Sequence, residues 1–190
     1  MEIIDPIECA KNLISCPSIT PIEGGAIKLL DEILTKMGFK CEIVTFSDEI
    51  ETVTNLYARF GNSSPNFCFA GHTDVVPPGD EQAWVTPPFS PKIIDGNLVG
   101  RGTVDMKGAI ASMVAAISRF LAKNYKFPGS ISLLITGDEE ARSINGTKKL
   151  LEFLEKRNEK IDFAIVGEPT NPEIIGEMIK IGRRGSISFE

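Results

Sequence analysis

Three short apolar runs, each followed at once by acidic side chains, constrain the fold of this chain more than any other feature. FCFA leads to His72 and Asp74, LLIT leads to Asp138, Glu139 and Glu140, and AIV leads to Glu168. Continuously apolar runs of this length are typical of strands that are covered on both faces of a sheet. Helical patterns separate them, so the chain predicts an α/β fold built on a mixed, largely parallel sheet flanked by helices.

The other periodic segments supply the elements around these strands. A helix is expected from Asp5-Pro6 to Ser15, and a second one between Ile22 and Phe39, where Gly38 takes the position of a left-handed C-terminal cap. Two more helices are expected over 106–123 and 146–157. Strands are expected over 40–46, 55–60, 66–70, 130–136 and 162–166, and a hairpin turning at Asp95-Gly96 interrupts the long Pro- and Gly-rich connection 75–102.

Composition excludes several classes of partner. The formal net charge of -6 disfavours nucleic acid and anionic membranes, because both require a basic face. The four cysteines stand far apart among apolar neighbours, which indicates reduced, structural thiols. The N-terminus lacks the pattern of a signal peptide, and no apolar stretch reaches membrane-spanning length, so we expect a soluble cytoplasmic protein.

The acids that follow the strands predict a metal site. The carboxyl ends of strands line the ligand crevice of an open α/β sheet, so these side chains are expected to converge. Asp105, just before the third helix, can face the same crevice. Each acid also has a plainer explanation as a helix cap or a solvated turn residue. Gathered together, however, the carboxylates would repel one another unless a cation neutralised them, and a single histidine beside them suits zinc, manganese or magnesium.

Local spacing suggests separate roles within this cluster. His72 and Asp74 point the same way in an extended segment, so the Asp74 carboxylate is expected to accept one imidazole N–H and leave the other nitrogen free for metal. Adjacent Glu139 and Glu140 should diverge. One of them can then bind metal while the other acts as general base on a water molecule.

Six motifs resemble those of the two-zinc exopeptidase and deacylase family: GHTDVVPPGD, W…PPF, DGNLVGRGTVDMKG, TGDEEA, VGEPT and IKIGRRGS. The resemblance implies two Zn²⁺ ions, for which Co²⁺ can substitute. It assigns metal binding to His72 and Glu168 at one ion and Glu140 at the other, with Asp105 bridging both. It also implies that Asp74 supports His72, that Glu139 is the catalytic acid and base, and that a cis peptide follows Asp105.

The same resemblance divides the chain and implies a substrate. Residues 1–178 would belong to a zinc-hydrolase catalytic domain, and residues 179–190 would begin a smaller α+β lid and dimerisation domain of a homodimeric parent. Lys180, Arg183 and Ser186 would then lie near substrate carboxylates, although a solvated basic turn explains them equally well. The expected substrate is an N-acylated amino acid, above all N-succinyl-diaminopimelate, which would be cleaved to succinate and diaminopimelate.

One part of the family pattern is missing. The pattern includes a second histidine ligand near the end of a longer chain, and this chain reaches Glu190 without it. We therefore expect a truncated chain with one complete and one incomplete metal site, weakly active or inactive by itself. The alternatives are a related deacetylase, aminoacylase or dipeptidase, a metal-dependent phosphohydrolase, for which the G-x-x-x-x-G-K-[ST] spacing is lacking, and a non-catalytic metal-binding fragment.

Overall fold

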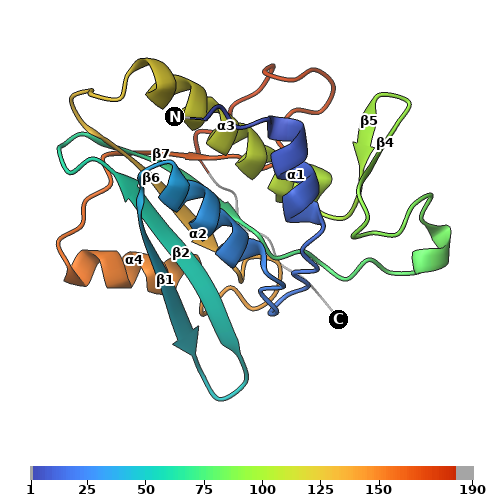
Figure 1. Ribbon diagram of the computed structural model, residues 1–190. Coiled ribbons are helices and arrows are strands. Elements are labelled where there is room, and N and C mark those ends of the chain that lie inside the picture. Colours follow the sequence, from blue (N-terminus) through green and yellow to red (C-terminus); the bar gives the residue numbers. More distant parts are fainter. Residues whose placement is uncertain (1, 183–190) are drawn as a thin grey trace.

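A five-stranded mixed sheet forms the middle of three layers in the computed structural model, which describes residues 2–182 (Figure 1). The strands lie in the order β1 (Lys40–Ser47), β2 (Thr52–Phe60), β6 (Ser130–Thr136), β3 (Asn66–His72), β7 (Phe163–Val166). β2 is antiparallel to both β1 and β6, whereas β3 is parallel to β6 and to β7. Within this sheet β2 alone runs against the others, so the predicted mixed, largely parallel sheet is confirmed.

Helices cover both faces of the sheet. They are α1 (Pro6–Ile14), α2 (Ala26–Lys36), α3 (Gly108–Lys123) and α4 (Thr147–Lys156). The first three bury their apolar stripes against one face in a single large core, which includes Leu13, Leu30, Ile110 and Leu133. On the opposite face α4 packs Leu150 and Leu154 against Tyr57, Cys68 and Leu134. The helical periodicity read from the sequence therefore identified the buried faces.

The second helix is shorter than its sequence pattern predicted. It begins at Ala26, not at Ile22, because Gly24 and Gly25 adopt left-handed conformations with φ of 60° and 93°. A Cβ atom at Gly24 would lie 2.6 Å from the backbone of Pro17, so the chain needs glycine where it turns into the helix. The predicted cap is confirmed, since Gly38 has φ 91°.

Strand β7 corrects the prediction that 162–166 is a buried strand. Its side chains are exposed, with Phe163 at 60%, Ile165 at 49% and Val166 at 58% relative exposure. An apolar run indicates burial only if the strand has neighbours on both sides and layers on both faces. β7 is an edge strand of the described sheet and pairs only with β3 there, so its sequence was a poor guide to its burial.

The long connection after β3 forms the part of the molecule that extends away from the sheet (Figure 1). It holds a short 3-10 helix at Glu81–Ala83 and a two-stranded hairpin of β4 (Lys92–Ile94) and β5 (Asn97–Val99). Asp95 and Gly96 turn the hairpin with positive φ, as predicted. A distorted helical turn, Thr103–Lys107, then leads into α3. No helix within residues 2–182 has both the length and the hydropathy needed to cross a bilayer.

Candidate metal centre

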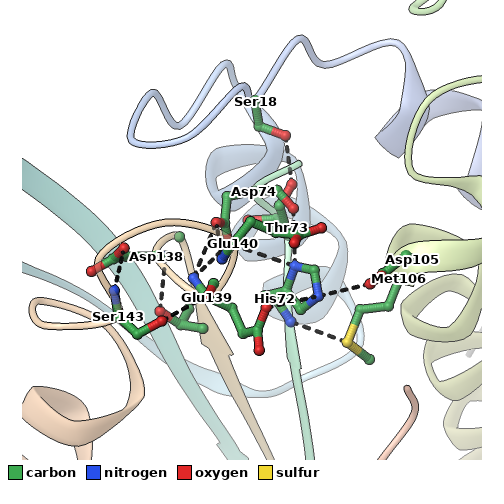
Figure 2. Close-up of polar contacts among 12 residues, drawn as sticks. Ser18, His72, Thr73, Asp74, Asp105, Met106, Asp138, Glu139, Glu140 and Ser143 are labelled. Carbon is green, nitrogen blue, oxygen red and sulfur yellow. Dashed lines mark hydrogen bonds and ion pairs between the residues drawn. The ribbon is translucent and has the colours of Figure 1, made fainter. Parts of the chain in front are cut away.

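Three potential ligands converge where the parallel strands end. His72 is the last residue of β3, Glu168 follows β7, and Asp105 lies on the turn before α3. One ligand atom from each of these residues lies within 4.8 Å of the others. Nε2 of His72 is 3.0 Å from Oδ1 of Asp105 and 3.4 Å from Oε1 of Glu168 (Figure 2 draws the first contact). Two strand ends and the turn before α3 thus bring together three of the four predicted metal ligands.

This donor set fits a divalent cation. One imidazole nitrogen with two carboxylates is typical of zinc sites, and manganese accepts the same ligands. His72 is 1% exposed, whereas the Asp105 and Glu168 side chains are partly open to solvent. A cation held here would therefore have one buried ligand, His72, and would remain accessible to solvent on the side of the two carboxylates.

The charge around His72 favours the same conclusion. Burial alone opposes protonation of the ring, but the hydrogen bond with Glu168 and the negative charge of Asp74 outweigh it and raise the pKa of His72 to about 9. The carboxylates thus favour a positive charge at this point. A divalent cation would supply that charge in place of the ring proton.

Asp74 supports His72 in a way that differs from the prediction. Nδ1 of His72 is 2.9 Å from the backbone carbonyl oxygen of Asp74, whereas the nearer carboxylate oxygen is 3.6 Å away. The carboxylate instead accepts the backbone N–H groups of Glu139 and Glu140, each at 3.0 Å (Figure 2). The carbonyl therefore orients the imidazole, and the carboxylate ties β3 to the loop after β6.

Glu139 and Glu140 follow β6 on the same loop, and their carboxylates have different surroundings. Oε2 of Glu139 lies 3.9 Å from Nε2 of His72, so this carboxylate reaches the mouth of the site. Burial raises the pKa of Glu139, and Glu168 adds to the shift while His72 opposes it. Burial also raises the pKa of Glu140, followed by the negative charge of Asp105. Glu140 is not part of the converging triad but lies within electrostatic reach of Asp105, the residue expected to bridge two ions.

Asp138, the first acid after β6, has a structural role. It is 1% exposed, and its carboxylate accepts the backbone N–H groups of Ser143, Ile144 and Asn145 at 2.9–3.0 Å. These bonds close the loop that carries Glu139 and Glu140. Asp138 therefore stabilises the loop through its carboxylate, and Glu139 and Glu140 are the two acids that this loop carries.

Of the three residues expected near the substrate carboxylates, the structure describes one. Lys180 is exposed on an irregular segment that follows β7, and Arg183 and Ser186 lie outside the described residues. The peptide bond between Asp105 and Met106 is cis, as the resemblance implied. The four cysteines are unpaired, as expected. Sequence reasoning missed Lys107, which is completely buried two residues after Asp105, because nothing in its sequence neighbourhood distinguishes it from a surface lysine.

Comparison with known proteins identifies the family. The model of peptidase family M20/M25/M40 matches residues 68–187, which is well over half of the chain and includes every residue of the converging triad. The chain belongs to peptidase family M20/M25/M40. Membership in this family implies the use of a divalent metal.

Curated relatives in this family are close in sequence but longer. The chain is 59% identical over 191 residues to the succinyl-diaminopimelate desuccinylase of Pelagibacter ubique, covering 100% of this chain and 50% of that protein. It is 54% identical over 185 residues to the enzyme of the same name from Rhodospirillum centenum, covering 97% of this chain and 48% of that protein. The chain therefore spans about half the length of the curated relatives it matches.

Solved structures of the family share the fold. A metallo-carboxypeptidase of the M20 family from Sulfolobus solfataricus superimposes with a TM-score of 0.72 at 27% identity, over 88% of this chain and 37% of that one. Human carnosine dipeptidase 1 also gives a TM-score of 0.72, at 24% identity over 85% of this chain and 37% of that one. The second similarity supports the fold alone.

Proposed function

We propose that this chain is the metal-binding part of an amide hydrolase that removes the succinyl group from N-succinyl-LL-2,6-diaminopimelate. The products are succinate and LL-2,6-diaminopimelate. The observation that carries the proposal is the convergence of His72, Asp105 and Glu168 on one point, with the Glu139 carboxylate beside it. The choice of substrate follows from the names of the relatives that are 54–59% identical to this chain.

The proposed cofactor is a pair of Zn²⁺ ions, with Co²⁺ as a substitute. His72 and Glu168 would hold one ion and Glu140 the other, and Asp105 would serve as a ligand to both. Burial and then the negative charge of Asp105 raise the pKa of Glu140. This repulsion supports the arrangement, because it means that the two carboxylates interact electrostatically. When bound, the ions supply a Lewis acid for the amide carbonyl and lower the pKa of water.

The residues of the chain perform the proton transfers in this proposal. Glu139 accepts a proton from the attacking water and returns it to the leaving amine, which frees diaminopimelate. The elevated pKa of its carboxyl suits that task, because a base must bind the proton and then release it. Asp74 keeps Glu139 in place through the backbone N–H bond at 3.0 Å.

The test separates metal binding from turnover. Zinc content and desuccinylation are measured on this chain and on a version extended to the length of its relatives, each with and without Glu139→Gln. We expect Glu139→Gln to keep the metal and to lower turnover of the extended version by at least about a thousandfold, within the range that general base catalysis contributes together with positioning. Unchanged turnover in the Glu139→Gln variant would contradict the assignment.

The second candidate function differs from the first in the acyl group that is removed. The structural similarity to an M20 metallo-carboxypeptidase at 27% identity makes peptides and other N-acylated amino acids the second candidates. A panel of N-succinyl, N-acetyl and dipeptide substrates distinguishes them. A chain that binds zinc but cleaves none of them, even when extended, would be a metal-binding module instead.

The proposal also includes a soluble, cytoplasmic homodimer as the whole protein, with Lys180, Arg183 and Ser186 near the substrate carboxylates. The four unpaired cysteines support a reducing compartment. Burial raises the pKa of Cys9 and of Cys68 to about 11, which keeps both thiols protonated and unreactive.

A further inference from the structure

Lys107 is among the largest side chains that the described part of the structure buries completely. Lysine is almost never buried without a partner, because removing an ammonium group from water is costly. Its partner is the backbone carbonyl of Cys16, to which Nζ donates a hydrogen bond of 2.7 Å. Lys107 therefore connects the turn that carries Asp105 to a segment ninety-one residues away in sequence.

The structure leaves a path for this side chain. The backbone N–H of Lys107 donates to the carbonyl of Gly102, and the lysine stem lies close to that glycine. A Cβ atom at Gly102 would lie 3.1 Å from Cδ of Lys107 and 2.8 Å from Cγ1 of Val75. The close approach requires glycine here, so the route of the stem to Cys16 is built into the packing.

The segment Cys16–Ser18 lies against the chain that continues from β3. The carbonyl of Cys16 also accepts the backbone N–H of Ser18 at 2.8 Å. Ser18 then makes two bonds to the continuation of β3: Oγ donates to the carbonyl of Thr73 at 2.5 Å, and the carbonyl accepts the N–H of Val75 at 2.9 Å (Figure 2 shows the first). Fixing Cys16 thus fixes Ser18 against residues 73–75.

One peptide group carries this constraint to the metal centre. The peptide between Asp74 and Val75 donates its N–H to Ser18, and its carbonyl is 2.9 Å from Nδ1 of His72. The opposite ring nitrogen, Nε2, faces Asp105 at 3.0 Å. A rotation of this peptide would turn the imidazole away from the carboxylates that share the site.

We propose that Lys107 is a positioning residue for the metal centre, holding Cys16–Ser18 against the Asp74–Val75 peptide so that this carbonyl keeps the His72 imidazole aimed at the ligand cluster. The inference rests on the proposed function only in treating that cluster as a metal site. The inference predicts that loss of the Lys107 ammonium group weakens cation binding, whereas loss of its charge alone would strengthen it. Removal of a positive charge near a cation site strengthens cation binding, whereas loss of an oriented ligand weakens it.

The chain contains a single histidine, so its imidazole NMR signals belong to His72 without ambiguity. In the metal-free chain we expect a Nδ1–H signal protected from exchange with water. Lys107→Met, which keeps the length of the side chain and removes its ammonium group, should shift this signal and speed its exchange at least tenfold. Zinc titrated against the same imidazole signals should bind at least about tenfold more weakly to the variant.

A second variant keeps the test valid if Lys107→Met does not fold. Ser18→Ala leaves Lys107 in place and removes the hydroxyl that donates to Thr73 at 2.5 Å and lies 3.5 Å from the Cys16 carbonyl oxygen, so it should change the His72 signal in the same direction by a smaller amount. Its matched control is Ser132→Ala, since Ser132 is equally buried and its hydroxyl donates to Oδ1 of Asn66 at 2.9 Å, away from the metal centre. That control should leave the His72 signal and zinc affinity unchanged.

The results separate this inference from the function it rests on. Zinc binding that is equal or tighter in Lys107→Met, or an unaltered His72 signal in Ser18→Ala, would overturn the positioning role. If instead the unmodified chain shows the protected Nδ1–H signal but no response to zinc, the proposed metal site fails. The two variants then still report, without metal, whether the path from Lys107 controls the imidazole.

Discussion

Arg142, on the loop that carries Glu139 and Glu140, forms an ion pair with Asp48 at the tip of the β1–β2 hairpin, with Nη1 2.8 Å from Oδ2. The same carboxylate accepts the backbone N–H groups of Ile50 and Glu51. Those two backbone bonds lead the interactions that lower the pKa of Asp48 to about 2. The hairpin tip and the loop of the candidate site are therefore joined through the ionised carboxylate of Asp48, and Glu51 adds a second ion pair with Arg142 at 3.1 Å.

Asp48 gives the first prediction, on pH. Its pKa is lower in the folded chain than in the unfolded chain, so its contribution to stability is complete above the unfolded value near 3.8 and is lost as pH falls toward about 2. Urea unfolding should show a free-energy difference between the native chain and Asp48→Asn that shrinks over this interval. Glu49→Gln is the matched control, because Glu49 accepts none of these bonds. A difference that stays constant down to pH 2.5 would refute the assignment.

The second prediction concerns the metal ligands. Asp105→Asn should weaken zinc binding by at least about a hundredfold, because a neutral amide replaces a charged ligand at the centre of the cluster. Asp74→Asn should weaken it by about 10- to 100-fold, since Asp74 acts on the site through His72 and the Glu139 loop. Isothermal titration measures both, and Asp80→Asn, an exposed acid on the connection after β3, should bind zinc normally. Equal affinities in all three variants would mean that zinc binds elsewhere.

The third prediction concerns the loop between β6 and α4. A Cβ atom at Gly146 would lie 2.3 Å from Oγ1 of Thr136 and 2.4 Å from the carbonyl oxygen of Asp138. The backbone must shift to admit it, so Gly146→Ala should cost about 1–3 kcal/mol of stability. The shift should also displace Glu139 and weaken zinc binding. The control is Gly79→Asn, since Gly79 has open space around it and asparagine tolerates its positive φ. Stability equal to that of the control would show that the loop is pliable.

The fourth prediction concerns the central strand β6. Leu133 is fully buried in the larger core, so Leu133→Ala should lower the free energy of unfolding by about 2–5 kcal/mol. Ile50→Ala, at a hairpin position that is 75% exposed, should change it by less than about 0.5 kcal/mol. Thermal and urea unfolding of the two variants provide the comparison. Similar losses at both positions would be inconsistent with the described core.

The gathering of His72, Asp105 and Glu168 was predictable from sequence, and the reason is geometric. Parallel strands place their carboxyl ends at one edge of a sheet, so ligands that follow β3 and β7 had to meet once the strands were recognised. The acceptor for the imidazole was not predictable. Asp74 offers a carboxylate and a carbonyl within reach of the same ring, and only the path of the neighbouring segment decides between them.

Lys107 and β7 show where local sequence is insufficient. A lysine is normally solvated, and its burial depends on a carbonyl supplied by Cys16, which no local pattern reveals. The apolar run of β7 indicated a covered strand, but exposure depends on what packs beside it. Both properties are set by contacts between segments far apart in the chain, and single-sequence periodicity carries no information about those contacts.

The ligands of the candidate centre are supplied in the order His72, Asp105, Glu168, and the last of them follows the edge strand β7. During synthesis on the ribosome, the sheet can begin to form around β3 and β6 well before this final carboxylate leaves the exit tunnel. A cation captured earlier would be held by an incomplete set of donors and would exchange readily. Docking of β7 against β3 is thus the step that would complete the donor set of the candidate centre.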